Sequence, residues 1–214
     1  MSYAVKETYF TLQGEGAQTG RAAVFLRFSG CNLWSGREQH RGQGPGGCAR
    51  WCDTDFVGVD GPGGGRFADA DDLAQHVLSF WPGGGRPLVV CTGGEPLLQL
   101  DPTLISALHA KGFEIAVESN GTIAAPSGID WLTISPKPGS KLVQRQGQEL
   151  KLVYPQVETE AHPDHFAKLS FTHFFLQPLD GPDQARNIQR TVDYCLAHPQ
   201  WRLSLQTHKV TGLA

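Results

Sequence analysis

Short apolar runs alternate with amphipathic segments along most of the chain. Runs rich in β-branched and aromatic residues predict strands, and they cover residues 23–28, 87–91, 113–117, 131–135, 150–154, 174–177 and 202–206. Apolar positions at helical spacing predict helices over residues 69–81, 101–112 and 184–198. Strands interleaved with helices are typical of an α/β fold with a largely parallel sheet. Because helices are fewer than strands, we expect an incomplete TIM-like barrel with about six mainly parallel strands and few helices.

The predicted helices carry ordinary capping signals at their ends. Asp101-Pro102 offers an N-cap and a first-turn proline, and Lys111-Gly112 offers a basic last turn and a C-cap glycine. Pro199 ends the last predicted helix, since proline cannot continue the hydrogen-bond ladder. Near the C-terminal end, the positions expected to face the core are Ile188, Val192, Cys195, Leu196, Leu203 and Leu205.

Composition and charge narrow the class of protein. The 214 residues are 40% hydrophobic and 18% charged, which is typical of a folded chain. We interpret residues 1–214 as one domain, since no linker separates two segments. The net charge of −3 argues against a general nucleic-acid surface, and no apolar run approaches the ~18 residues of a membrane span. We therefore expect a cytoplasmic protein that binds neither nucleic acids nor membranes.

Cysteines are clustered rather than spread along the chain. Of the five, Cys31, Cys48 and Cys52 lie within 22 positions in a C-x16-C-x3-C pattern. In a cytosolic chain such a cluster indicates a metal or catalysis more often than disulfides. Three thiolates on one loop can hold three corners of a metal site and leave the fourth open, as a catalytic metal requires. The alternative is a structural zinc site, closed by His40 or Cys91.

A glycine turn follows the most apolar predicted strand. The segment is Thr92-Gly93-Gly94-Glu95-Pro96. Glycines at the carboxyl end of a strand let a ligand approach the backbone, and α/β folds place their sites at that end. An ordinary tight turn explains the segment equally well when it is taken alone. Cys91 and Cys195 lie in apolar elements and are interpreted as core residues.

Several short segments carry a family resemblance in addition to the cysteine loop and the glycine turn. They are residues 10–16 (FTLQGEG), 31–36 (CNLWSG), 52–56 (CDTDF), 118–121 (ESNG), 135–137 (SPK), 177–181 (QPLDG) and 206–209 (QTHK). They resemble the radical S-adenosylmethionine superfamily and, more narrowly, the 7-carboxy-7-deazaguanine synthase family, over essentially the whole chain. The long segment between the first two cysteines matches the branch that lacks the compact C-x3-C-x2-C loop. Three residues separate Cys48 from Cys52, where the family usually has two.

The resemblance implies a cofactor pair and a reaction. It implies a 4Fe–4S cluster held by Cys31, Cys48 and Cys52, whose open iron binds S-adenosylmethionine. The implied reaction is a radical ring contraction of 6-carboxy-5,6,7,8-tetrahydropterin to 7-carboxy-7-deazaguanine with loss of ammonia, in queuosine or 7-deazapurine biosynthesis. The residues implied in contacting S-adenosylmethionine are Trp51, Cys52, Asp53, Gly94, Glu118, Ser135, Pro136, Lys137, Gln177, Pro178, Leu179 and Asp180.

The resemblance also implies which residues contact the pterin substrate. They are Leu12, Gln13, Gly14, Arg27, Thr92 and the C-terminal carboxylate of Ala214. Arg27 suits the substrate carboxylate because a guanidinium offers a two-pronged fork. Without the family, a surface arginine on the outward face of a strand explains it equally well. His208 and Lys209 either act near the substrate or belong to a solvated C-terminal segment.

The pair Asp53-Thr54 has two interpretations. Taken alone, it is typical of a helix cap. The resemblance instead makes Thr54 a ligand of Mg²⁺, with the ion bridging to the substrate carboxylate. Magnesium takes oxygen ligands and usually keeps several waters, which is compatible with a single protein hydroxyl in its shell.

Partners and rival functions complete the expectations. We expect an external one-electron donor such as a flavodoxin, and a homodimer. One rival is a glycyl-radical activating enzyme, which acts on a partner protein and does not need Gln13-Gly14-Glu15 or Asp53-Thr54. The other is a non-catalytic module stabilised by zinc, which predicts a colourless protein where a cluster predicts a brown one.

Overall fold

The computed structural model of the chain describes residues 2–41 and 52–213. Its strands are β1 (Tyr3–Leu12), β2 (Ala22–Phe28), β3 (Gly65–Phe67), β4 (Leu88–Gly93), β5 (Glu114–Ser119), β6 (Trp131–Ile134), β7 (Gln146–Tyr154), β8 (Ser170–Pro178) and β9 (Trp201–Leu203). Its α-helices are α1 (Ala70–Ser79), α2 (Pro102–Ala110), α3 (Gln184–Ala197) and α4 (Thr207–Thr211). Within the described ranges, none of the helices has the length and apolar character that crossing a membrane requires.

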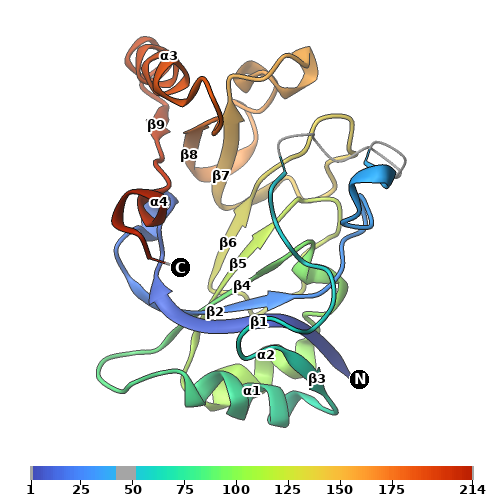
Figure 1. Ribbon diagram of the computed structural model, residues 1–214. Coiled ribbons are helices and arrows are strands. Elements are labelled where there is room, and N and C mark those ends of the chain that lie inside the picture. The colour runs from blue at the N-terminus through green and yellow to red at the C-terminus, as the bar shows by residue number, and fades with distance from the viewer. Residues whose placement is uncertain (1, 42–51, 214) are drawn as a thin grey trace.

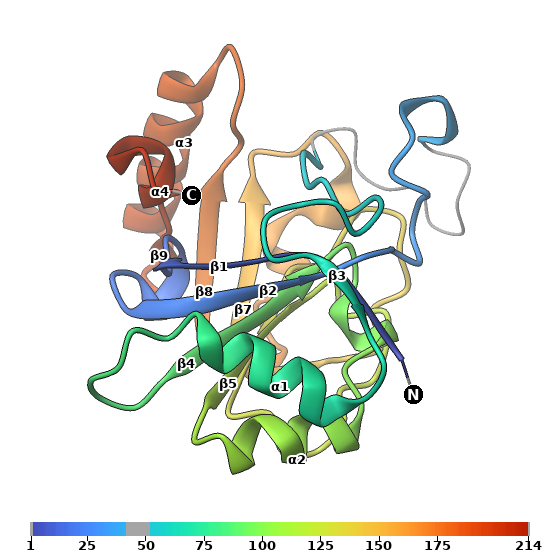
Figure 2. The same ribbon diagram turned by 60° about the horizontal axis from the view of Figure 1, so that its bottom comes forward.

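The strands form one open sheet of nine in the order β3-β1-β2-β4-β5-β6-β7-β8-β9. The run from β2 through β4 to β9 is parallel, whereas β1 pairs antiparallel with both β2 and β3. The sheet twists strongly, so that β1 and β2 cross the direction of β7 and β8 (Figure 2). The predicted α/β fold with a mainly parallel sheet and few helices is therefore confirmed, and the sheet is larger than the six strands expected.

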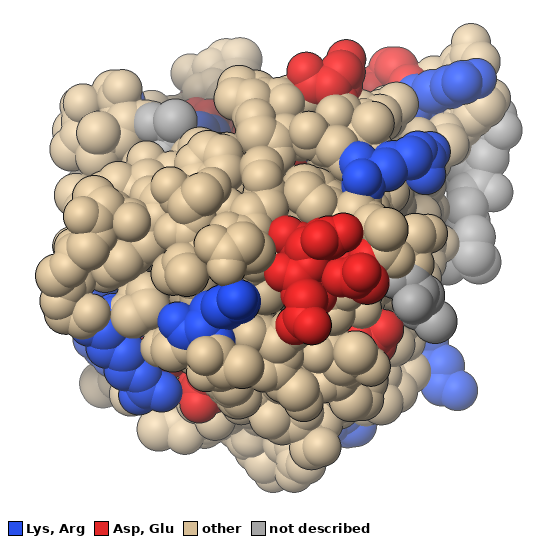
Figure 3. Space-filling model, turned by 90° about the horizontal axis from the view of Figure 1, so that it is seen from below, with Lys and Arg blue, Asp and Glu red and all other residues tan. Residues whose placement is uncertain are grey.

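The main hydrophobic core lies between the sheet and the helices α1 and α2, which pack together below it (Figure 1). Leu73 and Val77 of α1 and Leu104 and Leu108 of α2 are fully buried, as their helical spacing predicts. Asp69 caps α1 by accepting a hydrogen bond from the amide of the helix's third residue. The outer surface on this side is mostly uncharged, with one compact group of acidic side chains (Figure 3). This side of the sheet is thus covered by the helices that pack against the core.

β1 is an element that the apolar pattern does not predict, because buried polar side chains interrupt its alternation. Lys6, Thr8 and Thr11 are all buried in the folded chain. Lys6 Nζ donates to the carbonyl oxygen of Val57 (2.9 Å) and to Asp60 Oδ1 (2.8 Å). The strand thus holds the loop that follows the last clustered cysteine, and its polar positions serve that loop. The short elements β3 and α4 are also absent from the prediction.

The predicted inward face of α3 is partly wrong. Leu196 is 77% exposed, whereas Asn187 and Thr191 are buried. Asn187 Nδ2 donates to the carbonyl oxygen of Leu179 (2.9 Å), and Thr191 Oγ1 donates to the carbonyl oxygen of Asn187 (2.6 Å). The helix therefore presents a hydrogen-bonded polar face to the loop after β8, while Cys195 packs at the edge of the core.

The last predicted strand is too long, because β9 ends at Leu203. Beyond it, Ser204 Oγ accepts a hydrogen bond from the amide of Gly16 (2.9 Å), and the amide of Thr207 donates to the carbonyl oxygen of Gly14 (3.0 Å). These bonds join the C-terminal segment to the β1–β2 loop across the open side of the sheet. Two positions expected in the core are instead partly exposed: Leu203 and Leu205.

Candidate functional site

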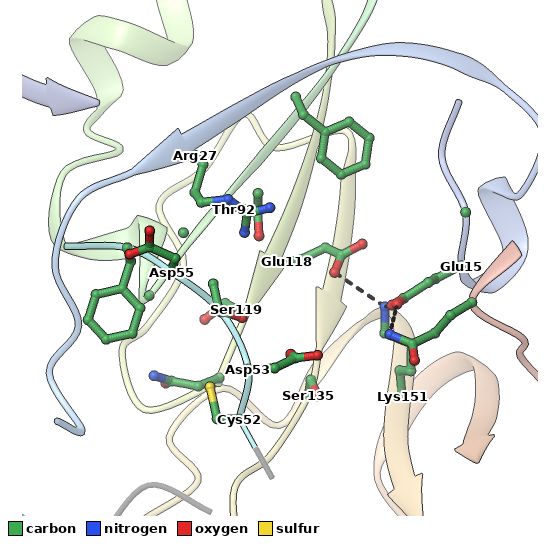
Figure 4. Close-up of a pocket in the computed structure, with 18 of the residues that line it drawn as sticks. Glu15, Arg27, Cys52, Asp53, Asp55, Thr92, Glu118, Ser119, Ser135 and Lys151 are labelled. Atoms are coloured by element: carbon green, nitrogen blue, oxygen red, sulfur yellow. Dashed lines mark hydrogen bonds and ion pairs between the residues drawn. The ribbon is translucent and has the colours of Figure 1, made fainter. Parts of the chain in front are cut away.

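A cavity of about 430 Å³ opens at the carboxyl ends of the parallel strands. Arg27 of β2, Thr92 of β4, Glu118 of β5, Ser135 just after β6 and Gln177 of β8 all line it. Figure 4 shows these strand ends and the loops around them converging on one space. In open α/β sheets ligands bind at this end, because the loops there can vary while the strands hold them in place.

The cysteine loop forms one wall of the cavity. Cys31 lies three residues after the end of β2. Both Cys31 and Cys52 line the cavity beside a small apolar cluster of Leu33, Trp34 and Phe56. Burial raises the pKa of the Cys31 thiol, although the amide of Leu33 donates to its Sγ (3.4 Å) and opposes that rise. A bound metal would reverse the effect, since ligating thiols are deprotonated. Two clustered thiols therefore face one cavity. Two further predicted site residues, Cys48 and Trp51, lie outside the described residues.

The glycine turn holds the cysteine loop against the sheet. The buried Glu95 donates its amide to the carbonyl oxygen of Gly30 (3.0 Å), and its carboxylate accepts from the amide of Leu97 (3.0 Å) and the hydroxyl of Ser119 (2.9 Å). Desolvation raises the pKa of this carboxyl, and the hydrogen bonds hold it back. A Cβ atom at Gly94 would lie only 2.4 Å from the same carbonyl oxygen of Gly30. The second glycine of the turn is thus required by close packing with the cysteine loop.

A closed zinc site is not formed by the described part of the chain. Among residues 2–41 and 52–213, no group of three or more His, Cys, Asp and Glu side chains is arranged to hold a metal ion. His40 Nδ1 instead pairs with Ser35 Oγ (2.8 Å), and Cys91 is fully buried within β4. Neither side chain completes a site with Cys31 and Cys52. This argues against a structural zinc site closed by His40 or Cys91.

Arg27 points into the cavity rather than out to solvent. Its Nε donates to Glu7 Oε1 (2.7 Å), and its Nη2 approaches the hydroxyl of Tyr9 (3.4 Å). Burial alone would lower the pKa of Arg27, but the paired carboxylate raises it. The outward-facing alternative for this residue is therefore wrong. Glu7 holds the Nε edge of the guanidinium, and the side chain as a whole lines the cavity.

A buried lysine forms the opposite wall. Lys151 of β7 is 4% exposed, and its ammonium donates to Glu15 and to Glu118 Oε2 (3.2 Å) (Figure 4). Gln13 Nε2 also donates a hydrogen bond to Glu118 Oε1 (2.9 Å). Glu149 lies close enough for its charge to act on the Lys151 ammonium. Desolvation lowers the pKa of Lys151, but the three carboxylates outweigh it and the net pKa is raised. The ammonium therefore stays charged inside the protein.

The C-terminal segment lines one side of the cavity. His208 and Lys209 both line it; His208 is half-buried, whereas Lys209 remains exposed to solvent at the rim. Lys209 Nζ forms an ion pair with Asp180 in the loop after β8. It also lies 3.5 Å from Oδ2 of Asp53, the residue that follows Cys52. A Cβ atom at Gly14 would lie 2.5 Å from His208 Nδ1, so only glycine leaves room for the imidazole. One short helix thus links two loops that face each other across the opening.

Asp53 and Thr54 do not cap a helix. They lie in an irregular segment, and the next α-helix, α1, begins at Ala70 after its own cap, Asp69. Both residues line the cavity. The capping interpretation is therefore wrong, and the Thr54 hydroxyl remains available to a ligand.

Most predicted site residues come together in the cavity. Those that line it are Leu12, Gln13, Gly14, Arg27, Cys31, Cys52, Asp53, Thr54, Thr92, Gly94, Glu118, Ser135, Lys137 and Gln177. Pro136 lies instead on a neighbouring space of about 380 Å³ that shares Lys137. The residues that line neither space are Pro178, Leu179 and Asp180. Ala214, like Cys48 and Trp51, lies outside the described residues.

Sequence reasoning misses several polar residues of the cavity wall. Lys151 lies in a predicted strand, where the apolar pattern indicates burial but no role in a site. Glu7 and Lys6 lie in β1, which the apolar pattern does not predict. In the sequence, each of them can be recognised as a charged residue inside an otherwise strand-like run. Such a residue needs a buried partner, and a ligand site is one place that supplies it.

Comparisons with known proteins agree on one family. The protein named 7-carboxy-7-deazaguanine synthase from Caulobacter vibrioides is 62% identical over 214 residues, and that from Bradyrhizobium diazoefficiens is 60% identical over 214 residues; each match covers 100% of both chains. The crystal structure of QueE from Escherichia coli superposes with a TM-score of 0.70 at 30% identity, covering 96% of this chain and 94% of that one. No family model matches the chain.

The contact of Gly94 with the cysteine loop can be tested by substitution. Gly94→Ala places a methyl group 2.5 Å from Cys31 Cβ, and we expect it to lower the free energy of unfolding by about 1–3 kcal/mol, the range for overpacking. The loop must move away, so the Cys31 thiol should also react faster with an alkylating reagent. Chemical denaturation and mass spectrometry measure both. Gly65→Ala is the control, because its nearest neighbour would be an ordinary 3.7 Å away; equal effects of the two substitutions would contradict the close packing.

Proposed function

The chain belongs to the 7-carboxy-7-deazaguanine synthase family, and from that premise we propose that it converts 6-carboxy-5,6,7,8-tetrahydropterin to 7-carboxy-7-deazaguanine with loss of ammonia. It would do so as a radical S-adenosylmethionine lyase of queuosine or 7-deazapurine biosynthesis. The observation that carries the proposal is the shared cavity, in which two cysteines of the motif face polar side chains from the ends of five parallel strands. A cofactor and a small molecule can therefore meet there out of bulk water.

A 4Fe–4S cluster would be held by Cys31, Cys48 and Cys52. The wall around Cys31 and Cys52 supports this assignment, because it is apolar and one backbone amide already points at the Cys31 sulfur. With S-adenosylmethionine bound at its open iron, the cluster supplies the radical chemistry, which belongs to the cofactors. The task of the protein is to position both ligands and to exclude water.

S-adenosylmethionine would lie across the strand ends beside the cluster. Gln177 supports this, since its Oε1 is buried without a hydrogen-bond partner in the described structure. Glu118 and Ser135 would offer oxygen atoms to hydroxyl and amino groups of the ligand. The full proposed set is Trp51, Cys52, Asp53, Gly94, Glu118, Ser135, Pro136, Lys137, Gln177, Pro178, Leu179 and Asp180.

The pterin would be contacted by the β1–β2 side of the cavity. The Nη groups of Arg27 suit its carboxylate, and Thr92 offers a hydroxyl from the neighbouring strand. Gln13 and the backbone of the β1–β2 loop would face the heterocycle. The proposed contacts are Leu12, Gln13, Gly14, Arg27, Thr92 and Ala214.

Magnesium would be bound through the Thr54 hydroxyl and the substrate carboxylate. Thr54 lines the cavity beside Cys52 and caps no helix, which supports a ligand role. A lone hydroxyl is a weak ligand for Mg²⁺. The ion should therefore bind poorly until the substrate joins its shell.

Partners and location follow from the same family. We propose an external one-electron donor such as a flavodoxin, a homodimer and a cytoplasmic location. Among the described residues, Cys91 and Cys195 form no disulfide, which supports a reducing compartment. The rival glycyl-radical activating enzyme needs access for a protein loop, whereas the C-terminal segment and the β1–β2 loop cover this cavity in a way that favours a small molecule.

The cysteine assignment is tested by anaerobic reconstitution with iron and sulfide. We expect Cys31→Ala, Cys48→Ala and Cys52→Ala each to abolish both the brown chromophore and product formation, because each removes a cluster ligand. Cys195→Ala is the matched control, since Cys195 packs at the edge of the core and should leave the cluster intact. Iron and sulfide counts and the visible spectrum measure the cluster. An active, fully loaded Cys48→Ala enzyme would remove Cys48 from the site.

Arg27→Ala should weaken substrate binding far more than S-adenosylmethionine binding. The loss expected is about 1.5–3 kcal/mol, the range for a hydrogen bond to a charged group. Calorimetry on the unreduced enzyme measures both ligands without turnover. Arg21→Ala is the control, because Arg21 makes a similar ion pair with Glu114 (3.0 Å) but does not line the cavity. Equal losses for both ligands in Arg27→Ala would mean that this arginine only supports the fold.

Thr54→Val should raise the magnesium concentration needed for half-maximal activity, because it deletes an oxygen ligand and keeps the shape. Thr54→Ser retains the hydroxyl and should follow the wild-type curve. Cluster content and S-adenosylmethionine cleavage without substrate should be unchanged in both variants. Activity titrated against magnesium makes the comparison, and an unchanged midpoint in Thr54→Val would end the metal assignment.

A further inference from the structure

Lys151 is the most deeply buried cation of the cavity wall, and its partners come from distant parts of the chain. Its ammonium donates to Glu15 of the β1–β2 loop and to Glu118 at the end of β5. Gln206 Nε2 of the C-terminal segment donates to Glu15 Oε1 (3.0 Å). One charge on β7 therefore holds three other segments that surround the cavity.

The same charge fixes the orientation of a side-chain amide. Gln13 Nε2 donates to Glu118 Oε1 (2.9 Å), while Gln13 Oε1 accepts from the amide of Glu15 (3.1 Å). Lys151 thus holds the carboxylate of Glu118 that accepts from the Gln13 amide, and it also binds the side chain of Glu15, whose backbone amide contacts the other end of Gln13. We call Lys151, Glu15, Glu118 and Gln13 the Lys151 network.

The Lys151 network keeps hydrogen-bonding capacity for ligands. A carboxylate has about four acceptor sites and an amide has two donors and two acceptor sites. Only part of this capacity is used within the network by Glu118 and by Gln13. Both side chains line the cavity, so a ligand bound there could use their remaining capacity.

Stability alone is a poor reason for this arrangement. Burial by itself raises the pKa of Glu15, but the Lys151 ammonium outweighs it and the net pKa is lowered, so Glu15 remains an anion. Glu149 stays close by with a pKa raised by desolvation. Replacing a buried ion pair by apolar side chains is often neutral or stabilising. A network of buried charges that touches the ligand cavity is therefore better explained by what it positions.

We propose that Lys151 is a positioning residue that couples the S-adenosylmethionine site to the pterin site, by fixing Glu118 for one ligand and Gln13 for the other. This inference rests on the proposed function, in which Glu118 contacts S-adenosylmethionine and Gln13 contacts the pterin. Either ligand, once bound, orders the shared network and so prepares it for the second ligand. The effect is reciprocal, as any coupling between two binding equilibria must be.

The coupling is measured on the reconstituted, unreduced enzyme, where both ligands bind without turnover. In the wild type, saturating 6-carboxy-5,6,7,8-tetrahydropterin should lower the Kd of S-adenosylmethionine by about fivefold or more, the lower end of typical coupling. In Lys151→Met the change should fall below about twofold. Lys111→Met is the control, because Lys111 bonds to Gln75 on the surface and should leave the coupling intact.

A double variant separates positioning from folding. Lys151→Met alone leaves buried carboxylates without a counter-charge and should unfold at lower temperature. Adding Glu15→Gln removes one of those charges and should recover much of the melting temperature, while the coupling stays lost because Glu118 still lacks its ammonium. If the double variant also recovers the coupling, or if the wild type binds both ligands independently, the proposal is wrong. A wild type that binds neither ligand would instead overturn the proposed function itself.

Discussion

The geometry of the site depends on one buried carboxylate, which needs hydrogen-bond donors from the protein. Glu95 is fully buried, and the hydrogen bonds that its carboxylate and amide require come from the cysteine loop, from the turn after β4 and from the end of β5. An unpaired carboxylate at this depth would be costly, so these three segments can only be placed together. The position of Cys31 relative to the sheet follows from that requirement, and with it the position of anything that Cys31 holds.

Charge in the cavity wall is arranged in pairs before any ligand arrives. Lys6, Arg27, Lys151 and Lys209 each face a carboxylate from another segment of the chain. A paired cation stays ionised inside the protein, because the neighbouring carboxylate offsets the cost of burying its charge. An anionic ligand such as a carboxylate must share these cations with their partners. The cavity therefore selects molecules whose charges fit the positions left open between the pairs.

The sequence predicts the parts of the molecule that follow a simple period, and it fails where polar residues replace apolar ones. The helices α1 and α2 and the parallel strands were within reach of the apolar pattern, because Leu73, Leu104 and similar positions are buried at regular spacing. The apolar pattern does not predict the strand β1, since Lys6 is buried there to donate a hydrogen bond to a loop 51 residues further along the chain. The same holds for Lys151, whose role lies in contacts with Glu15 and Glu118, 136 and 33 residues away. Motif resemblance located most of the cavity but not the charges that hold it.

The contacts between the β1–β2 loop and the C-terminal segment join residues 188 to 193 positions apart. Closing so long a loop carries an entropic cost that no local contact offsets, so these bonds are expected to form late in folding. During synthesis, residues 13–16 leave the ribosome long before residues 204–207 exist to meet them. The sheet and its helices can assemble in that interval, while the cavity stays open on one side. The wall of the cavity is therefore completed last, by the residues that are synthesised last.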